Sequence, residues 1–256
     1  MLTVLVSSYN DRNLIPTMLG LVCRALPDVE KEIIIVDDVS TDGSREWLRE
    51  NFPDGERSCT HIAVGSNGNL TFSDAQPGAR ITFRPLFHEK NKGKGAVLQT
   101  ALAAATGDLM VIQDGDLEYD PQDWTAMYDL IAVRKVADVV YGSRFYGLPH
   151  RALRFHHYMA NSIISLFFSV LYDQKLTDVE TCYKMFTREV RDSLRITHND
   201  FGVELQLGAQ IVLARRWRIY EVAIHYYGRT HAEGKKINWK DGVKALWYLV
   251  KYRFVS

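Results

Sequence analysis

The chain has 256 residues, of which 46% are hydrophobic and 24% are charged, and basic and acidic side chains are equal in number at 31 each. This composition is ordinary for a globular protein, and the length is sufficient for one large domain or for a domain with an appendage. A net charge of zero gives no bulk electrostatic attraction to nucleic acid, so we expect no nucleic-acid partner and only local recognition of anions.

The N-terminal part alternates predicted strands with predicted helices. Residues 2–8 and 32–38 are apolar, β-branched runs typical of buried parallel strands, and the second run ends in Asp37 and Asp38. Helices are expected over residues 14–26 and, after a loop and cap over 40–44, through Arg49. Turn residues interrupt the pattern over 53–85 around short candidate strands at 61–64 and 81–83, which predicts an inserted loop or hairpin.

A third predicted strand leads into the most acidic loop of the chain. A helix over 96–105 precedes an apolar strand over 109–113, and Asp114, Gly115, Asp116 and Glu118 follow. Asp114 and Asp116 are one residue apart on an extended segment, so their side chains point the same way. Such a carboxylate pair suits a divalent cation that bridges the protein to a nucleotide diphosphate, although an acidic surface turn has the same pattern.

The remaining elements continue the alternation. We expect helices over 122–136 and from Glu204 to Arg215, and strands over 137–144 and 220–227. These elements predict an α/β fold, in which an open, mostly parallel sheet is flanked by helices and ligands bind at the carboxyl ends of the strands.

Two later helices carry apolar stripes. The helix over 155–172 is interpreted as core packing, with contact to a bilayer surface as the alternative, and the helix over 239–252 is amphipathic. We expect no spanning helix, because the most apolar later stretch of the chain, residues 163–172, falls well short of the roughly 20 residues that a spanning helix needs. We expect one domain over 1–236, with 237–256 either part of that domain or a peripheral membrane contact.

The cysteines and the N-terminus indicate the compartment. Cys23, Cys59 and Cys182 are odd in number and lack metal-ligand spacing, which favours a reducing environment over a disulfide framework. Residues 1–10 have neither the basic region nor the cleavage site of a secretory signal. We therefore expect a cytoplasmic location, with peripheral attachment to the membrane as an option.

The acidic strand ends occur together with three further motifs at 91–96, 142–144 and 178–186. Over residues 2–236, the order and spacing of these motifs resemble the family 2 glycosyltransferases of the GT-A fold. The resemblance is greatest to the branch of dolichyl-phosphate mannose synthase and other polyprenyl-phosphate hexose synthases. It implies a GT-A domain for nucleotide-diphospho-sugars, with Mg²⁺ or Mn²⁺ as cofactor.

The resemblance also implies roles at the donor side. Asp116 is expected to ligate the metal, with Asp114 and Glu118 in or beside its shell. Contacts to the nucleotide sugar are implied for Ser8, Tyr9, Asp11, Asp37, Asp38, Lys94, Asp114 and Gly115. Asp11 replaces the more usual Glu, Asp37 could instead cap the following loop, and Lys92 and Lys94 could be solvated lysines at a helix start.

At the acceptor side, catalytic roles are implied for Asp116, Arg144, Asp178 and Lys184, and phosphate contacts for Arg144, Thr181, Arg229 and Lys235. A guanidinium fork suits phosphate oxygens, although Arg144 could instead form a salt bridge to Asp138 or another acid at the sheet edge. The basic loop 229–236 is expected either to close over a phosphate or to be a solvated turn. Cys182 stands where relatives often carry Gly, and we expect a small buried residue rather than a nucleophile.

The implied reaction is an inverting, metal-dependent transfer of a hexose from a GDP- or UDP-linked sugar to a polyprenyl phosphate. A phosphate acceptor is already an oxyanion at neutral pH and needs no strong base. One alternative is a soluble transferase that acts on a saccharide or small-molecule hydroxyl, with Asp178, Glu180 or Glu204 as base. The other is a nucleotide-sugar binding module without catalysis.

Overall fold

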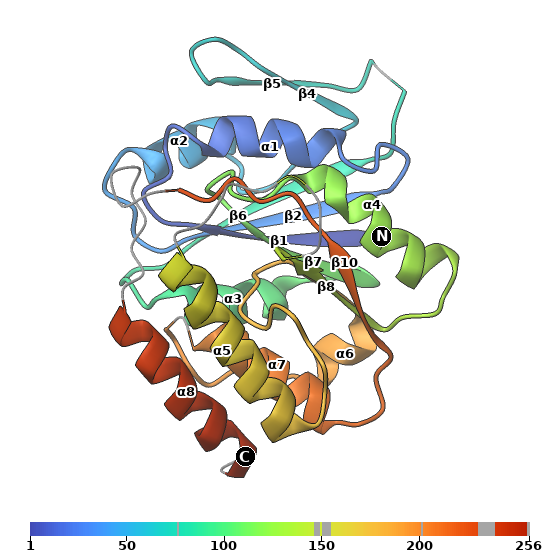
Figure 1. Ribbon diagram of the computed structural model, residues 1–256. Helices are drawn as coiled ribbons and strands as arrows, with labels where there is room; N and C mark the ends of the chain where they lie inside the picture. Colours follow the sequence, from blue (N-terminus) through green and yellow to red (C-terminus); the bar gives the residue numbers. More distant parts are fainter. Residues whose placement is uncertain (76, 146–148, 150–154, 201, 230–238, 255–256) are drawn as a thin grey trace.

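The computed structural model describes residues 1–75, 77–145, 149, 155–200, 202–229 and 239–254 (Figure 1). An eight-stranded sheet runs through the centre of the molecule. In spatial order its strands are β10 (Ile219–Ala223), β8 (Val139–Ser143), β9 (Lys184–Thr187), β7 (Leu109–Asp114), β1 (Leu2–Ser8), β2 (Lys31–Asp37), β6 (Ile81–Phe87) and β3 (Arg57–Cys59).

The sheet is mostly parallel. Strand β1 pairs in parallel with β2 and β7, β2 pairs in parallel with β6, and β8 pairs in parallel with β10. Two strands run the other way, namely β9 between β7 and β8, and β3 beside β6. The predicted open, mostly parallel α/β sheet is confirmed.

Helices cover both faces of this sheet, which explains why β1 and β2 are apolar on both sides (Figure 1). One face carries α1 (Ile15–Arg24), α2 (Ser44–Asn51) and α4 (Trp124–Tyr128). The other carries α3 (Lys94–Ala104), α5 (Phe155–Tyr172), α6 (Arg188–Ser193), α7 (Val203–Leu213) and α8 (Trp239–Phe254). Val4 and Val6 therefore pack into one core and Leu5 into the other.

None of the helices in the ranges described above combines the length and the apolar character that crossing a bilayer requires. Helix α8 packs on α5 and α7, and it buries Ala245, Leu249 and Tyr252 in the core of its face.

Three segments differ from their predicted form. Within 53–85, only β4 (His61–Val64) and β5 (Leu70–Ser73) form a separate hairpin, which lies outside α1, whereas β3 and β6 join the main sheet (Figure 1). The helix expected over 122–136 is divided into a 3₁₀ turn (Pro121–Asp123), α4 and a π-helical turn (Asp129–Val133). Pro121 starts the first turn, where the Asp120 side chain accepts a hydrogen bond from the Gln122 N–H at 3.0 Å.

The strand expected over 220–227 ends early, at Ala223. Beyond it the chain leaves the edge of the sheet and crosses to the acidic loop, where Tyr226 forms an isolated bridge with Tyr119. The carboxyl ends of the parallel strands β1, β2, β7 and β8 all open on this same edge of the sheet.

Candidate active site

Gly115 sits where the acidic loop leaves β7 and touches the end of β1. Its N–H donates to the Ser7 carbonyl at 3.2 Å. A Cβ at this position would lie 2.9 Å from the Ser7 carbonyl oxygen and 3.1 Å from Oδ2 of Asp11. Glycine is therefore required for the close approach of the loop to β1 and Asp11, which is a packing reason in addition to the predicted contact with a ligand.

Asp116 and Glu118 form the acidic centre of the loop, and Arg229 binds both. The Arg229 guanidinium donates from Nη2 to Oδ2 of Asp116 at 2.5 Å and from Nε to Oε1 of Glu118 at 3.1 Å. The Tyr226 hydroxyl donates to the other oxygen of Glu118 at 2.9 Å. Burial and the nearby charges of Asp114 and Glu118 raise the pKa of Asp116 to about 7 despite Arg229. This position therefore favours an additional positive charge.

The donor set of this loop fits a hard divalent cation that is shared with a ligand. No group of three or more His, Cys, Asp or Glu side chains within the described ranges is arranged to hold a metal ion by itself. Mg²⁺ usually binds one or two carboxylates and takes its other ligands from substrate phosphates and water. Asp116, with Glu118 beside it, provides that partial set of oxygen ligands, and a diphosphate would complete it.

Asp114, the other carboxylate of the predicted pair, is held by Lys94. The Lys94 ammonium lies 2.9 Å from Oδ1 of Asp114, 3.3 Å from Glu204 and 2.8 Å from the Cys182 sulfur. Burial raises the pKa of Asp114, but Lys94 and hydrogen bonds from Cys182 and Ser7 outweigh it and lower the pKa overall. Asp114 is therefore an ionised, protein-bound carboxylate.

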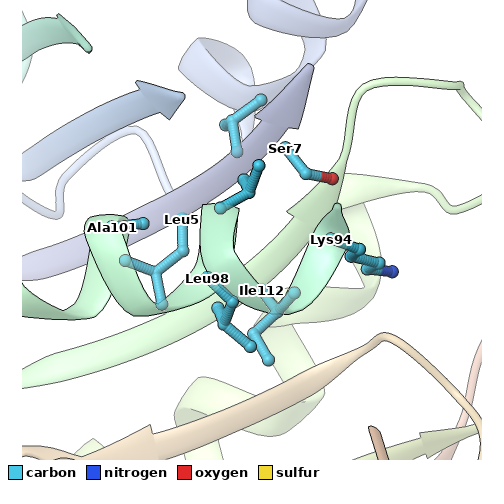
Figure 2. A pocket seen from close by; sticks show the side chains of 8 residues that line it. Leu5, Ser7, Lys94, Leu98, Ala101 and Ile112 are labelled. Carbon is cyan, nitrogen blue, oxygen red and sulfur yellow. The ribbon is translucent and has the colours of Figure 1, made fainter. Parts of the chain in front are cut away.

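A small apolar cavity lies under this network between α3 and the ends of β1 and β7. Lys94 is one of the residues that line this cavity, and Figure 2 shows its side chain pointing away from Leu98 and Ala101 of the same helix. The Lys94 amine and the Ser7 hydroxyl both reach Asp114, from α3 and β1 respectively. Lys94 thus ties the first turn of α3 to the end of β7, so it is not a solvated lysine.

Asp38, directly after β2, organises the segment before α3. Its carboxylate accepts hydrogen bonds from the backbone N–H groups of Lys92 at 2.9 Å and Gly93 at 2.7 Å. Nδ1 of the buried His88 lies 2.7 Å from the same carboxylate. Asp38 therefore fixes the predicted nucleotide-facing segment, and its direct contact with a nucleotide stays a prediction.

Asp37 caps the loop that follows β2, which is the alternative to a contact with the nucleotide. Its carboxylate accepts hydrogen bonds from the N–H groups of Val39 at 3.2 Å and Ser40 at 3.4 Å, and it lies 3.2 Å from the Arg45 guanidinium. Val39 adopts a positive φ of 65°, so this turn is a strained one that Asp37 stabilises.

The end of β1 presents three of the residues predicted to bind nucleotide. Tyr9 is exposed, and its N–H donates to Asp11 at 3.2 Å. The Ser8 hydroxyl is buried and hydrogen bonds to no group in the part of the chain that the structure describes. A buried hydroxyl of this kind is suited to a ligand that supplies the missing partner.

Arg144 and Asp178, which are predicted to lie near the acceptor, form a bidentate ion pair. The guanidinium donates from Nε at 2.6 Å and from Nη2 at 2.7 Å to the two carboxylate oxygens, and the Arg144 N–H adds a third bond at 3.1 Å. Asp138, the other partner considered from sequence, binds Arg218 instead. Arg144 therefore forms a salt bridge, but to Asp178 rather than to Asp138. The role of Arg144 as a phosphate clamp stays a prediction.

The neighbouring residues of the 178–186 segment lie deeper. Lys184 is completely buried and donates to Glu204 at 2.6 Å and to the Thr181 carbonyl, and Thr181 is buried as well. Cys182 is partly buried rather than fully buried as expected, and burial together with Asp114 raises the pKa of its thiol, which agrees with an inert residue. Predicted contacts of Lys184 and Thr181 with substrate stay predictions. Lys235 lies outside the described residues.

Glu180 differs from the other acids of this region. Asp178 and Glu204 each form an ion pair with a basic side chain, whereas Glu180 forms none with the described residues. Burial raises its pKa to about 7, the nearby Asp178 adds to this effect, and Arg144 opposes it. A carboxyl group with this pKa can exchange protons near neutral pH.

An aromatic cluster beneath the acidic loop was missed from sequence. The rings of Tyr119 and Tyr183 stack with centroids 4.7 Å apart, and Tyr226 lies 5.5 Å from Tyr119. This cluster supports Glu118 through the Tyr226 hydroxyl. The available signal was the run of two tyrosines just before Arg229, which sequence patterning assigned to a strand.

The sequence matches the family model of glycosyl transferase family 2 over residues 3–69 and 73–195. It is 23% identical over 208 residues to the glycosyltransferase AglJ of Haloferax volcanii, a match that covers 81% of this chain and 57% of that protein. It is 22% identical over 143 residues to the dolichol-phosphate mannosyltransferase of Pyrococcus furiosus, covering 56% of this chain and 33% of that protein. The chain thus spans between a third and just over half of the length of these relatives.

Among solved structures, the glucosyl-3-phosphoglycerate synthase of Mycobacterium tuberculosis has a similar fold. Its complex with Mn²⁺, UDP and phosphoglyceric acid matches 100% of this chain and 79% of that chain with a TM-score of 0.67 and 17% identity. The same synthase was also crystallised with Mg²⁺ and UDP. The likeness confirms the predicted GT-A fold. Because the family description covers most of the chain, including every acidic strand end described above, this protein belongs to glycosyl transferase family 2.

Proposed function

We propose that this protein is an inverting, metal-dependent transferase that moves a hexose from a nucleotide sugar to a polyprenyl phosphate. The donor is a GDP- or UDP-linked sugar, and the metal is Mg²⁺ or Mn²⁺. The leaving diphosphate gains negative charge as the sugar bond breaks, so cations at that position lower the barrier. Asp116 and Glu118 would hold the metal there, and Arg229, which binds both carboxylates, would contribute its own charge on the same side.

The observation that carries the choice of acceptor is that two of the three carboxylates considered as a base are held in ion pairs. Asp178 is bound bidentately by Arg144, and Glu204 is bound by Lys184. A carboxylate bound in this way is a poor base, because proton uptake would cost the ion pair. A phosphate acceptor needs no base, since it is already charged and requires only positioning. The similarity to the dolichol-phosphate mannosyltransferase of Pyrococcus furiosus supports the same acceptor class.

Glu180 favours the second candidate, a transferase acting on a saccharide or small-molecule hydroxyl. Its pKa of about 7 suits a general base that removes a proton from such an acceptor. In that case Glu180→Gln would lower the rate by about 10²–10⁴-fold, which is the usual contribution of a general base. The non-catalytic alternative predicts tight donor binding without transfer to any acceptor.

Transfer measured with a panel of GDP- and UDP-sugars, in the presence of Mn²⁺ or Mg²⁺, tests the proposal. Each donor is combined with a polyprenyl phosphate and, separately, with a set of saccharide acceptors. We expect glycolipid formation with one donor class, inversion at the anomeric carbon and no saccharide product. Folded enzyme that yields only saccharide product, or none, contradicts the proposal.

A further inference from the structure

Helix α5 has an outward-facing surface that is apolar. Its inner side packs into the core through Ile164, Phe168 and Tyr172. An ordinary surface helix presents charged residues on the opposite side, but residues 155–172 contain no Asp, Glu, Lys or Arg. The outer side instead exposes Met159, Ile163, Leu166, Phe167 and Val170, with Leu166 65% and Val170 76% exposed.

Helix α8 extends this surface. Trp247 and Phe254 are 59% and 72% exposed, and Val250 is exposed between them, on the side of α8 away from its buried residues. The two helices lie side by side (Figure 1), and Arg253 of α8 donates to the Leu171 carbonyl of α5 at 3.1 Å. We refer to these exposed side chains of α5 and α8 as the apolar face. Large apolar side chains exposed together on two adjacent helices are typical of a surface that binds a partner or a membrane.

The border of the apolar face is basic. Lys244 is exposed, and Lys251 and Arg253 are partly exposed, and these residues lie at the edges of the Trp247 side of α8. The Lys251 ammonium also lies 5.2 Å from the centre of the Trp247 ring. Apolar side chains bordered by Lys and Arg are the pattern of a helix that lies in the interface of an anionic bilayer.

An aromatic contact links helix α5 to the candidate active site. The ring of Tyr158, at the start of the described side chains of α5, packs edge-on against Phe145 at 5.5 Å. Phe145 directly follows Arg144, which binds Asp178. A surface seated on the apolar face would therefore lie near the side of the site where the acceptor is expected.

We infer that the apolar face docks on a lipid bilayer that contains anionic headgroups. The main rival occupant is a second copy of this chain. A symmetric dimer would place this face against itself, so the basic border of one copy would oppose that of the other, which is unfavourable. Anionic headgroups complement the same border. The inference deepens the proposed function, because a bilayer is where a polyprenyl phosphate is held.

Flotation with lipid vesicles that contain no polyprenyl phosphate tests docking separately from catalysis. Vesicles of phosphatidylcholine alone are compared with vesicles that also contain phosphatidylglycerol. The full chain is expected to float with the anionic vesicles, and added salt is expected to weaken binding. Leu166→Gln with Val170→Gln, and separately Trp247→Gln with Phe254→Gln, should each weaken binding by at least about tenfold.

Val133→Gln is the matched control, because Val133 is an equally exposed apolar residue outside the apolar face. It should bind as the unmodified protein does. Lys244→Gln with Lys251→Gln should reduce binding to anionic vesicles only. All variants change partly or fully exposed side chains, and thermal unfolding confirms that each is folded.

Three results would overturn the inference. The first is the absence of vesicle binding by the unmodified protein. The second is vesicle binding by the α5 and α8 variants that equals that of the unmodified protein. The third is a stable dimer, seen by sedimentation, that Leu166→Gln with Val170→Gln converts to monomer. A second copy of the chain, and not a bilayer, would then cover the apolar face. Vesicle binding without any transferase activity would leave docking intact and count against the proposed function alone.

Discussion

Arg229 binds Asp116 across 113 residues of sequence, with its Nη2 atom 2.5 Å from the carboxylate. A metal ion that binds Asp116 through this oxygen must share it with Arg229 or displace it, and one that binds through the other oxygen still lies beside the Arg229 charge. Arg229→Gln is therefore expected to strengthen the binding of Mn²⁺ to the protein alone by removing a competing cation. The same change should weaken the binding of a nucleoside diphosphate together with Mn²⁺, because one positive charge is lost beside the phosphates.

Calorimetric titration of Mn²⁺, with and without UDP or GDP, measures both effects. Arg218→Gln serves as control, because Arg218 pairs with Asp138 on an exposed part of the surface. Equal loss of metal binding and of nucleotide binding in Arg229→Gln would show that Arg229 does not compete with the metal.

Asp116→Asn is expected to lower the transfer rate by about 10²–10³-fold, the usual effect of removing one preorganised electrostatic contact from a transition state. It should also abolish the dependence of nucleotide binding on Mn²⁺. The rate and the binding constant are measured on the same preparation. Asp54→Asn, at an exposed position, should change neither quantity. A transfer rate unchanged in Asp116→Asn would remove the metal assignment.

Lys184→Met separates a structural role from a catalytic one. Lys184 is completely buried and bound to Glu204, so its removal leaves a buried carboxylate without its partner. We expect a loss of about 3–5 kcal/mol in the free energy of unfolding, measured with urea. Removing both charges, with Lys184→Met and Glu204→Leu together, should recover part of this loss. The exposed Lys175→Met should change stability by less than about 0.5 kcal/mol. Undiminished stability of Lys184→Met together with lost transfer would favour the catalytic role.

Glu180 predicts a pH dependence of stability. Its pKa is about 7 in the folded protein and near 4.5 ordinarily, so the folded state binds the proton more tightly than the unfolded state does. The contribution of this proton to stability is present below about pH 4.5 and is lost as the pH rises through about 7. Glu180→Gln should therefore gain stability relative to the unmodified protein over that interval. Parallel stability curves for the two proteins would contradict the raised pKa.

The strand ends of the site could be predicted from sequence because each is a local pattern. An apolar run that stops at an acidic residue marks both Asp37 and Asp114, and both lie at the carboxyl edge of the parallel sheet. The antiparallel insertion of β9 between β7 and β8 could not be predicted in this way. Its four residues carry no signal of direction, and only their partners define it.

The ion pairs of the site were also beyond local patterns. Arg144 meets Asp178 across 34 residues, and Arg229 meets Glu118 across 111 residues. Sequence provided the residue types, and both arginines were assigned to phosphate because a guanidinium suits either partner. The acids that each arginine binds are decided by how the chain returns over the sheet, which no residue in either segment specifies.

The most direct measurement compares a polyprenyl phosphate with the corresponding polyprenol as acceptor, at one nucleotide-sugar and Mn²⁺ concentration. The two lipids differ only in the phosphate that the proposed reaction requires. We predict glycosylated lipid from the polyprenyl phosphate and none from the polyprenol, with Glu180→Gln losing less than about tenfold in rate, well below the cost of removing a general base. Transfer to the polyprenol, or a much larger loss in Glu180→Gln, would contradict transfer to a preformed phosphate oxyanion.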